Sequence, residues 1–160
     1  MDISRKTDYA LRMLAMLAEG NKSLLSVRTA AEAVDVPYSF ARSIQHGLVQ
    51  AGIVESLRGV RGGMRLRLKP SEITIRRIVE AVQGPLVMND CTAEEGMCPR
   101  MECCCYHPIW AGAQELLRDY LDSVTLDDVV NHRQYPAVDV KFTDRDRFVE
   151  YASCGKVCGK

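Results

Sequence analysis

The sequence lacks the features that define several large classes of protein. No apolar run approaches the roughly 18 residues of a transmembrane helix, so we expect no membrane-spanning segment and no membrane partner. The opening residues, MDISRK, contain no apolar stretch before a cleavage site, so we expect no signal peptide and a cytoplasmic location. The chain has no internal repeat, phosphate-binding glycine loop, cofactor fingerprint or nucleophile–base motif. We therefore expect that it is not an enzyme.

The chain also lacks a net charge, but the balance hides an uneven distribution. Its 21 basic and 21 acidic residues cancel over 160 residues. Residues 1–70 carry 11 Lys and Arg against 6 Asp and Glu, whereas residues 71–160 carry 10 against 15. A basic first half favours a polyanionic partner, and an acidic second half argues against nucleic acid coating the whole chain.

The hydrophobic pattern of residues 1–70 predicts three helices followed by a β-hairpin. The helices are expected over 7–19, 27–34 and 38–51, and the strands over 53–57 and 64–68. Thr7 or Asp8 is expected to cap the first helix, and Phe40, Ile44 and Leu48 to face inward from the third. This order is that of a winged helix-turn-helix, in which the third helix enters the major groove and the hairpin is the wing.

Two groups of residues are candidates for contacts with double-stranded DNA. On the exposed face of the third helix they are Ser39, Arg42 and Ser43, because arginine can pair with guanine and serine with base or phosphate. In the wing they are Arg58, Arg61, Gly62, Gly63 and Arg65. Arginines fit phosphates or a narrow minor groove, and glycines allow close backbone approach.

Residues 71–131 are expected to form a second unit, which binds a metal and forms a dimer. The pattern predicts a helix over 72–83, an irregular segment over 86–107, an amphipathic helix over 108–124 and a short helix through Asn131. The apolar stripe of the 108–124 helix has few partners within one small winged helix, so a second subunit is expected to cover it. Residues 132–160 read as a polar, weakly ordered tail, in which Cys154 and Cys158 have an incidental role.

Cysteines crowd the irregular segment. Five of the 7 cysteines lie in this segment: Cys91, Cys98, Cys103, Cys104 and Cys105. His107 follows them. Thiolates are soft ligands that hold zinc or iron–sulfur clusters, so this spacing favours a metal site without identifying the metal. The alternative is a set of free or disulfide-linked thiols without metal.

Several segments together resemble a known family. They are TDYALR at 7–12, VPYS at 36–39, RGVRGG at 58–63, the cysteines followed by His107 and Trp110, and TLDDVV at 125–130. Over roughly residues 1–131 the chain resembles the Rrf-type winged-helix iron–sulfur transcription regulators, the IscR-, NsrR- and RirA-like proteins. The resemblance implies a mainly α fold with a small β-hairpin wing and a long dimerisation helix that begins at Pro108.

The resemblance also implies a cofactor and its ligands. An iron–sulfur cluster, either [2Fe–2S] or [4Fe–4S], would be held by Cys91, Cys98 and Cys104. The fourth ligand would be His107, Asp8 from the other subunit, or a neighbouring thiol, Cys103 or Cys105. A weakly held oxygen or nitrogen ligand leaves one iron open to small molecules, which suits a sensor.

The expected function is therefore that of a homodimeric DNA-binding regulator, specifically a repressor. Its affinity for promoter DNA would be controlled by a cluster that senses nitric oxide, an oxidant or iron status. Because residues 86–107 join the 72–83 helix to the dimer helix, a change there can alter the spacing of the two DNA-reading units. The alternatives are a regulator switched by thiols or zinc without a cluster, and a metal or redox protein with no DNA role.

Overall fold

The computed structural model describes residues 2–19, 24–59, 62–93, 98, 104–132 and 135–137. In chain order, its elements are α1 (Arg5–Glu19), α2 (Val27–Ala33), α3 (Tyr38–Gln50), β1 (Val54–Leu57), β2 (Gly63–Leu66), η1 (Pro70–Glu72), α4 (Ile75–Gln83), η2 (Asp90–Thr92), α5 (His107–Ser123) and η4 (Asp128–His132). This order confirms the mainly helical fold with a two-stranded hairpin after the third helix. Within the described ranges, no helix has the length and apolar character needed to cross a membrane.

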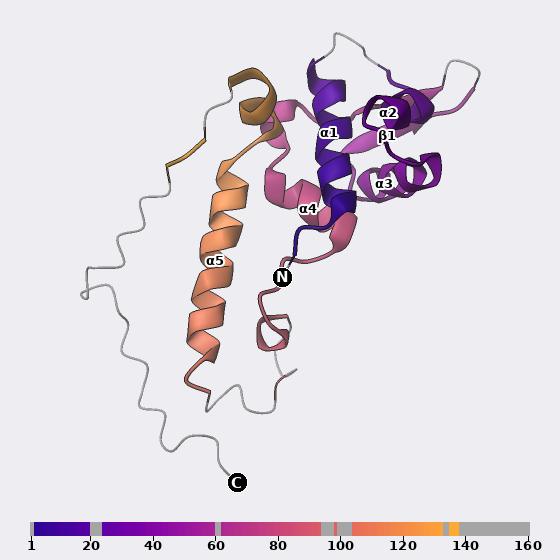
Figure 1. Ribbon diagram of the computed structural model, residues 1–160. Coiled ribbons are helices and arrows are strands. Elements are labelled where there is room, and N and C mark those ends of the chain that lie inside the picture. Colours follow the sequence, from indigo (N-terminus) through magenta and orange to yellow (C-terminus); the bar gives the residue numbers. More distant parts are fainter. Residues whose placement is uncertain are drawn as a thin grey trace.

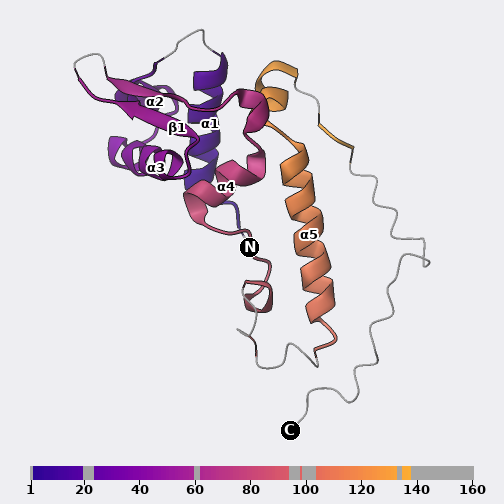
Figure 2. The same cartoon turned by 180° about the vertical axis from the view of Figure 1, so that it is seen from behind.

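One apolar core joins α1–α4 and the hairpin, and we call this part of the molecule the head (Figure 1). Helix α1 contributes the fully buried side chains of Met13 and Leu14, and α3 contributes Ile44 and Leu48. The chain after α5 returns to the same core, where Leu126 is buried. The C-terminal end of α5 therefore meets the head, while its N-terminal end projects away from it (Figures 1 and 2).

The hairpin is held to the rest of the head by backbone hydrogen bonds. Strands β1 and β2 pair antiparallel, with Glu55 opposite Arg65. Leu25 adds a bridge beside β2, where its N–H donates to the Met64 carbonyl at 2.9 Å and its carbonyl accepts from the Met64 N–H at 2.8 Å. This bridge fixes the direction in which the wing leaves the head.

Two details of the predicted head are wrong. Phe40 is 51% exposed instead of facing inward, because α3 packs through Ala41 and Gln45 as well as the predicted Ile44 and Leu48. Neither Thr7 nor Asp8 caps the first helix. Helix α1 begins earlier, at Arg5, and the hydroxyl of Ser4 accepts a 3.2 Å hydrogen bond from the Thr7 N–H.

The predicted 72–83 helix is divided, and its second part is tied to α5. A 3-10 turn, η1, comes first, and α4 then begins after Thr74, whose hydroxyl accepts from the Arg77 N–H at 3.2 Å. The same hydroxyl donates to Asp122 of α5 at 3.1 Å, and Arg76 forms a 2.7 Å ion pair with Asp122. This pairing raises the pKa of Arg76 through its hydrogen bond to the Asp122 carboxylate.

In the segment after α5, Thr125 and Asp128 cap each other by reciprocal hydrogen bonds. The hydroxyl and the N–H of Thr125 donate to the Asp128 carboxylate, at 2.6 and 2.8 Å, and the Asp128 N–H donates back to the Thr125 hydroxyl. The following turn, η4, is wider than an α-helix. Of the predicted tail, only His132 and residues 135–137 lie within the described residues, so Cys154 and Cys158 fall outside them.

Candidate DNA-binding face and cysteine site

Helix α3, which is predicted to be the recognition helix that enters the major groove, presents the three predicted residues to solvent. Ser39, Arg42 and Ser43 are all exposed, while the opposite face of α3 is buried in the core. The turn before α3 includes Asp35 at φ 52, a left-handed conformation that aspartate tolerates better than most residues. The turn and the buried face of α3 together leave a polar and basic surface at its N-terminal end.

Aromatic residues enlarge this surface, and their exposure was missed from the sequence. Tyr38 is 46% exposed and Phe40 is 51% exposed, both in the first turn of α3. The guanidinium of Arg28, from α2, lies 5.2 Å from the centroid of the Tyr38 ring, which is a cation–π contact. Arg28 therefore adds a positive charge beside the recognition helix. Its partner is ten positions away, so no local sequence pattern could reveal the contact.

The predicted wing residues differ in how available they are for contact with DNA. Arg58 is exposed, and Arg61 lies outside the described residues. Arg65 forms an ion pair with Glu55 across the hairpin, so part of its charge is neutralised. A Cβ atom on Gly62 would lie 2.4 Å from the Leu57 carbonyl oxygen, and one on Gly63 would lie 2.6 Å from that of Leu25. Gly62 is therefore required by the turn of the hairpin, and Gly63 by the Leu25 segment that pairs beside it.

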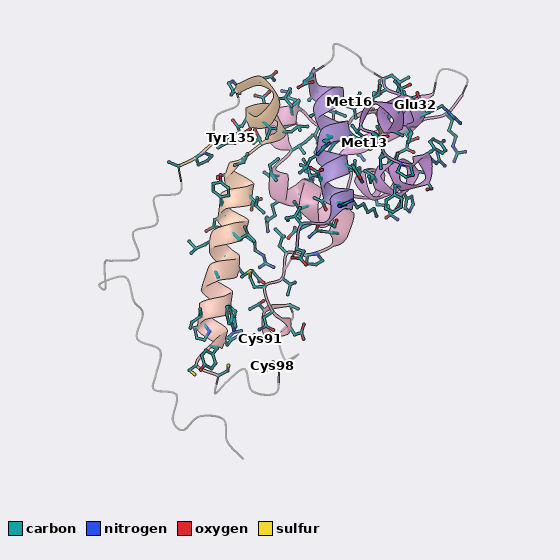
Figure 3. All side chains as sticks on the ribbon, in the orientation of Figure 1. Met13, Met16, Glu32, Cys91, Cys98 and Tyr135 are labelled. Atoms are coloured by element: carbon teal, nitrogen blue, oxygen red, sulfur yellow. The ribbon has the colours of Figure 1, made fainter. Side chains whose placement is uncertain are left out.

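The predicted ligand cysteines lie near the N-terminal end of α5. Cys91 lies in η2, and Cys91, Cys98 and Cys104 are half-buried and not in disulfides. Figure 3 shows Cys91 and Cys98 at the same end of the molecule as the start of α5. Cys105 is exposed, and Cys103 lies outside the described residues. Within the part of the chain that the structure describes, no three His, Cys, Asp or Glu residues form a group that could hold a metal ion.

Two of the four candidates for the fourth ligand, His107 and Asp8, differ in their surroundings. His107 is the first residue of α5, and its Nδ1 atom is buried without a hydrogen-bond partner among the described residues. An unpaired buried nitrogen is costly, so a bound electrophile at this atom would relieve the cost. Asp8 instead lies exposed on α1 and forms a 2.8 Å ion pair with Arg12.

Helix α5 leaves much of its apolar surface uncovered. Ile109 is 58% exposed, Trp110 is 37% exposed and Leu116 is 48% exposed. Gln114 is the only buried residue of the helix. This pattern differs from that of a helix packed into its own domain, whose apolar stripe is buried.

Comparison with known proteins agrees with the resemblance that the sequence suggested. Residues 3–132 match the Rrf2 family model, described as an iron-dependent transcriptional regulator. The chain is 33% identical over 134 residues to "Protein aau3" of Rhizobium meliloti, covering 83% of this chain and 87% of that protein. It is 32% identical over 148 residues to the HTH-type transcriptional repressor NsrR of Streptomyces coelicolor, covering 91% of this chain and 98% of that protein.

A solved structure with the same fold comes from a regulator named for a different signal. The structure is that of CymR (YrzC), described as the global cysteine regulator of B. subtilis. The similarity has a TM-score of 0.65 at 26% sequence identity, and covers 82% of this chain and 98% of that chain.

Proposed function

Since the chain belongs to the Rrf2 family of DNA-binding transcriptional regulators, we propose that it is a homodimeric repressor controlled by an iron–sulfur cluster. The observation that carries the cluster is the chemistry of the donors toward the start of α5, which among the described residues do not form a group that could hold a metal ion. Three half-buried thiols outside any disulfide accompany a buried His107 Nδ1 atom that has no partner among the described residues. Thiolates and imidazole are the donors that such clusters use.

The residues of this chain suit the cluster as follows. Cys91, Cys98 and Cys104 would be the thiolate ligands, and His107 or Asp8 from a second subunit would be the fourth. When bound, the cluster would supply an iron that reacts with nitric oxide or an oxidant. The protein residues hold the ligands and connect them to the head. His107 is well suited to this role because α5 fixes its backbone and its Nδ1 atom is already withdrawn from water.

For DNA binding, we infer that α3 enters the major groove and the hairpin contacts the backbone or the minor groove. The exposure of Ser39, Arg42 and Ser43 supports the first contact, and that of Arg58 supports the second. Arg61, Gly62, Gly63 and Arg65 remain predicted wing contacts.

The dimer would form through α5. Its exposed apolar residues, Ile109, Trp110 and Leu116, would pack against the same residues of a second copy, as twofold symmetry requires. The two heads would then contact half-sites about one helical turn, or a small multiple of it, apart.

The connection between site and head explains how the signal would act. Helix α4 ends at Gln83, and the chain then leads through Leu86 to Cys91. Helix α4 also packs directly on α3, since Gly47 lies against the Ala81 carbonyl. A structural change in residues 86–107, the cysteine segment, would therefore be transmitted to α3 through α4. A coupling of about 1–3 kcal/mol would change DNA affinity 5- to 150-fold.

The test is an absorbance spectrum of protein purified without oxygen, with iron and sulfide assays on the same sample. We expect visible bands that Cys98→Ala and Cys104→Ala abolish and Cys154→Ala preserves. Nitric oxide added to the wild-type sample should bleach the bands and change its affinity for promoter DNA. A colourless protein without iron or sulfide would overturn the cluster, and a full spectrum in Cys104→Ala would move the ligand to Cys103 or Cys105.

A regulator switched by thiols or zinc is the second candidate. Its support is the similarity to CymR, whose description names cysteine, together with the thiols of the cysteine segment. A colourless protein with bound zinc, or with thiols that form a reversible disulfide, would favour it. Family membership argues against the third alternative, a metal or redox protein with no DNA role.

A further inference from the structure

The only buried residue of α5 is polar. Gln114 is 3% exposed, although the apolar residues on other faces of the same helix are half-buried or exposed. An apolar side chain of similar size would cover this position without desolvating an amide. Burying an amide is unfavourable unless both of its polar groups are hydrogen-bonded, so its partners carry information.

Both polar groups of Gln114 bind one short turn. Its Oε1 accepts a 2.9 Å hydrogen bond from the Met88 N–H, and its Nε2 donates a 3.1 Å hydrogen bond to the Thr92 carbonyl. These two backbone groups stand on either side of Cys91. The side chain of Gln114 therefore holds both ends of the turn that carries the first cysteine.

The turn is also braced from within and anchored a second time. The Asp90 N–H donates to Asn89 Oδ1 at 2.8 Å, and the Thr92 hydroxyl donates to the Asn89 carbonyl at 2.8 Å. One helical turn beyond Gln114, the guanidinium of Arg118 donates to the carbonyl of the fully buried Leu86 at 3.2 Å. The segment from Leu86 to Thr92 is thus fastened to α5 by three side-chain hydrogen bonds.

Helix α5 also fixes the position of a second cysteine. Cys104 precedes the helix by three residues, and its carbonyl accepts from the His107 N–H at 3.3 Å. One thiol is therefore attached to α5 through the chain, and the other through the side chain of Gln114. Figure 3 shows Cys91 beside the same end of the helix.

We propose that Gln114 is a positioning residue that fixes Cys91 relative to Cys104 before anything binds the thiols. The arrangement would lower the ordering cost of assembling the site, because two of the three thiols are already mounted on one helix. Its use for an iron–sulfur cluster rests on the proposed function. The positioning itself would serve a zinc site or a disulfide switch equally.

The test measures the reactivity of each cysteine in the reduced, cluster-free full chain. Wild type, Gln114→Leu and Gln114→Met are pulsed with N-ethylmaleimide, and peptide mass spectrometry resolves the labelled positions. We expect Cys91 to react about tenfold faster in both variants, because opening of its turn no longer breaks two hydrogen bonds. The rate at Cys104 should stay within about twofold of wild type, since its attachment is covalent. Amide hydrogen exchange at Met88 should accelerate in parallel.

The matched control is Gln45→Leu. Gln45 is another buried glutamine, 6% exposed, whose amide donates to the Ser56 hydroxyl in the wing, and we expect no change at Cys91. An unchanged rate at Cys91 in both Gln114 variants would overturn the proposal. So would an equal acceleration at every cysteine, because that would reflect general loosening. A colourless wild-type protein would overturn the cluster alone, since the thiol assay needs no metal.

Discussion

The hydroxyl of Thr7 donates a 2.7 Å hydrogen bond to Oε1 of Gln83, which joins the start of α1 to the end of α4. The same oxygen accepts the Ser4 N–H at 3.1 Å, and the Gln83 amide donates to the Asp2 carbonyl at 3.1 Å. Thr7 is fully buried, whereas the hydrogen bond from Gln83 to Asp2 is exposed, so the network runs from the core to the surface. It fixes the point at which the chain leaves the head toward the cysteines.

Replacing Thr7 by valine keeps its shape and removes the donor. We expect Thr7→Val to lower the free energy of unfolding by about 0.5–1.5 kcal/mol, because the half-buried oxygen of Gln83 loses one of its two donors. Urea unfolding measures the change. Thr29→Val, at an exposed position in α2, should change it by less than about 0.5 kcal/mol. Equal effects of the two substitutions would argue that the Thr7–Gln83 bond contributes nothing specific.

The contact between α3 and α4 offers a test of the route from site to DNA. A Cβ atom on Gly47 would lie 2.8 Å from the carbonyl oxygen of Ala81, so Gly47→Ala must separate the two helices. We expect a loss of about 1–3 kcal/mol in stability, even though alanine favours helix. DNA affinity should fall as well, because α3 shifts.

The control for this contact is His46→Ala, one position earlier on the exposed side of α3. It should change stability by no more than about 0.5 kcal/mol. Stability is measured by urea unfolding, and affinity by a gel shift. A Gly47→Ala protein as stable as wild type would mean that α3 and α4 are not in close contact.

The hydrogen-bonded carboxylate of Asp128 should make the stability of the fold depend on pH in acid. Hydrogen bonds from the side chain and backbone of Thr125 lower the pKa of Asp128. A lowered pKa in the folded state stabilises the protein above the unfolded value, about 3.9, and this contribution is lost as pH falls through the folded pKa. We therefore expect wild type to lose stability more steeply than Asp128→Asn below about pH 4.

Urea unfolding at a series of pH values measures this difference. Glu32→Gln, which removes an exposed carboxylate from α2, should keep the wild-type slope. Parallel curves for wild type and Asp128→Asn would show that the Thr125 hydrogen bonds do not favour the ionised carboxylate.

The order of elements was predictable because each carries a local signal. The apolar period of three or four residues identified α1, α3 and α5, and alternating apolar and basic residues identified β2. Phe40 was assigned to the wrong face because the buried stripe of α3 includes a small residue, Ala41, and a polar one, Gln45. Glutamine is usually exposed, and alanine is too small to mark an apolar stripe as strongly as Phe40 does.

The contacts that organise the sites were not predictable, because they join distant positions. Gln114 meets Met88 and Thr7 meets Gln83 only after the helices have packed, and a single glutamine in an amphipathic helix has no distinguishing local pattern. The pairing of Arg65 with Glu55 likewise depends on the register of the hairpin. Residue types thus indicated what chemistry is present, whereas the packing determined which groups remain available.

The exposed face of α5 offers a test of the proposed dimer. Leu116 is 48% exposed in the protomer, and burying a leucine contributes about 1.5–3 kcal/mol. In a twofold-symmetric dimer, Leu116 of each protomer makes this contribution. We therefore expect Leu116→Glu to convert the proposed dimer to monomer at micromolar concentration. Leu57→Glu changes a comparably exposed leucine on β1 and should leave the dimer intact. Sedimentation velocity distinguishes the two, and a dimeric Leu116→Glu protein would place the interface elsewhere.

Breaking the ion pair across the hairpin is expected to strengthen DNA binding. Glu55 neutralises part of the charge of Arg65, so Glu55→Gln releases a guanidinium on the wing. We expect tighter binding to all DNA sequences, with the slope of log affinity against log salt steeper by about one unit. Stability should change by less than about 1 kcal/mol, because the pair is exposed. Arg58→Ala, Arg61→Ala and Arg65→Ala should each weaken binding on every sequence.

Glu115→Gln is the matched control for this charge change. Glu115 forms a 3.2 Å ion pair with Arg118 on α5, so the substitution adds the same charge away from the wing. Affinity for a promoter duplex is measured for both variants over a range of salt concentrations. A gain confined to Glu55→Gln assigns the phosphate contact to Arg65, because long-range attraction by net charge would strengthen both. An equal gain in the two variants would remove Arg65 from the interface and leave the recognition helix as the main contact.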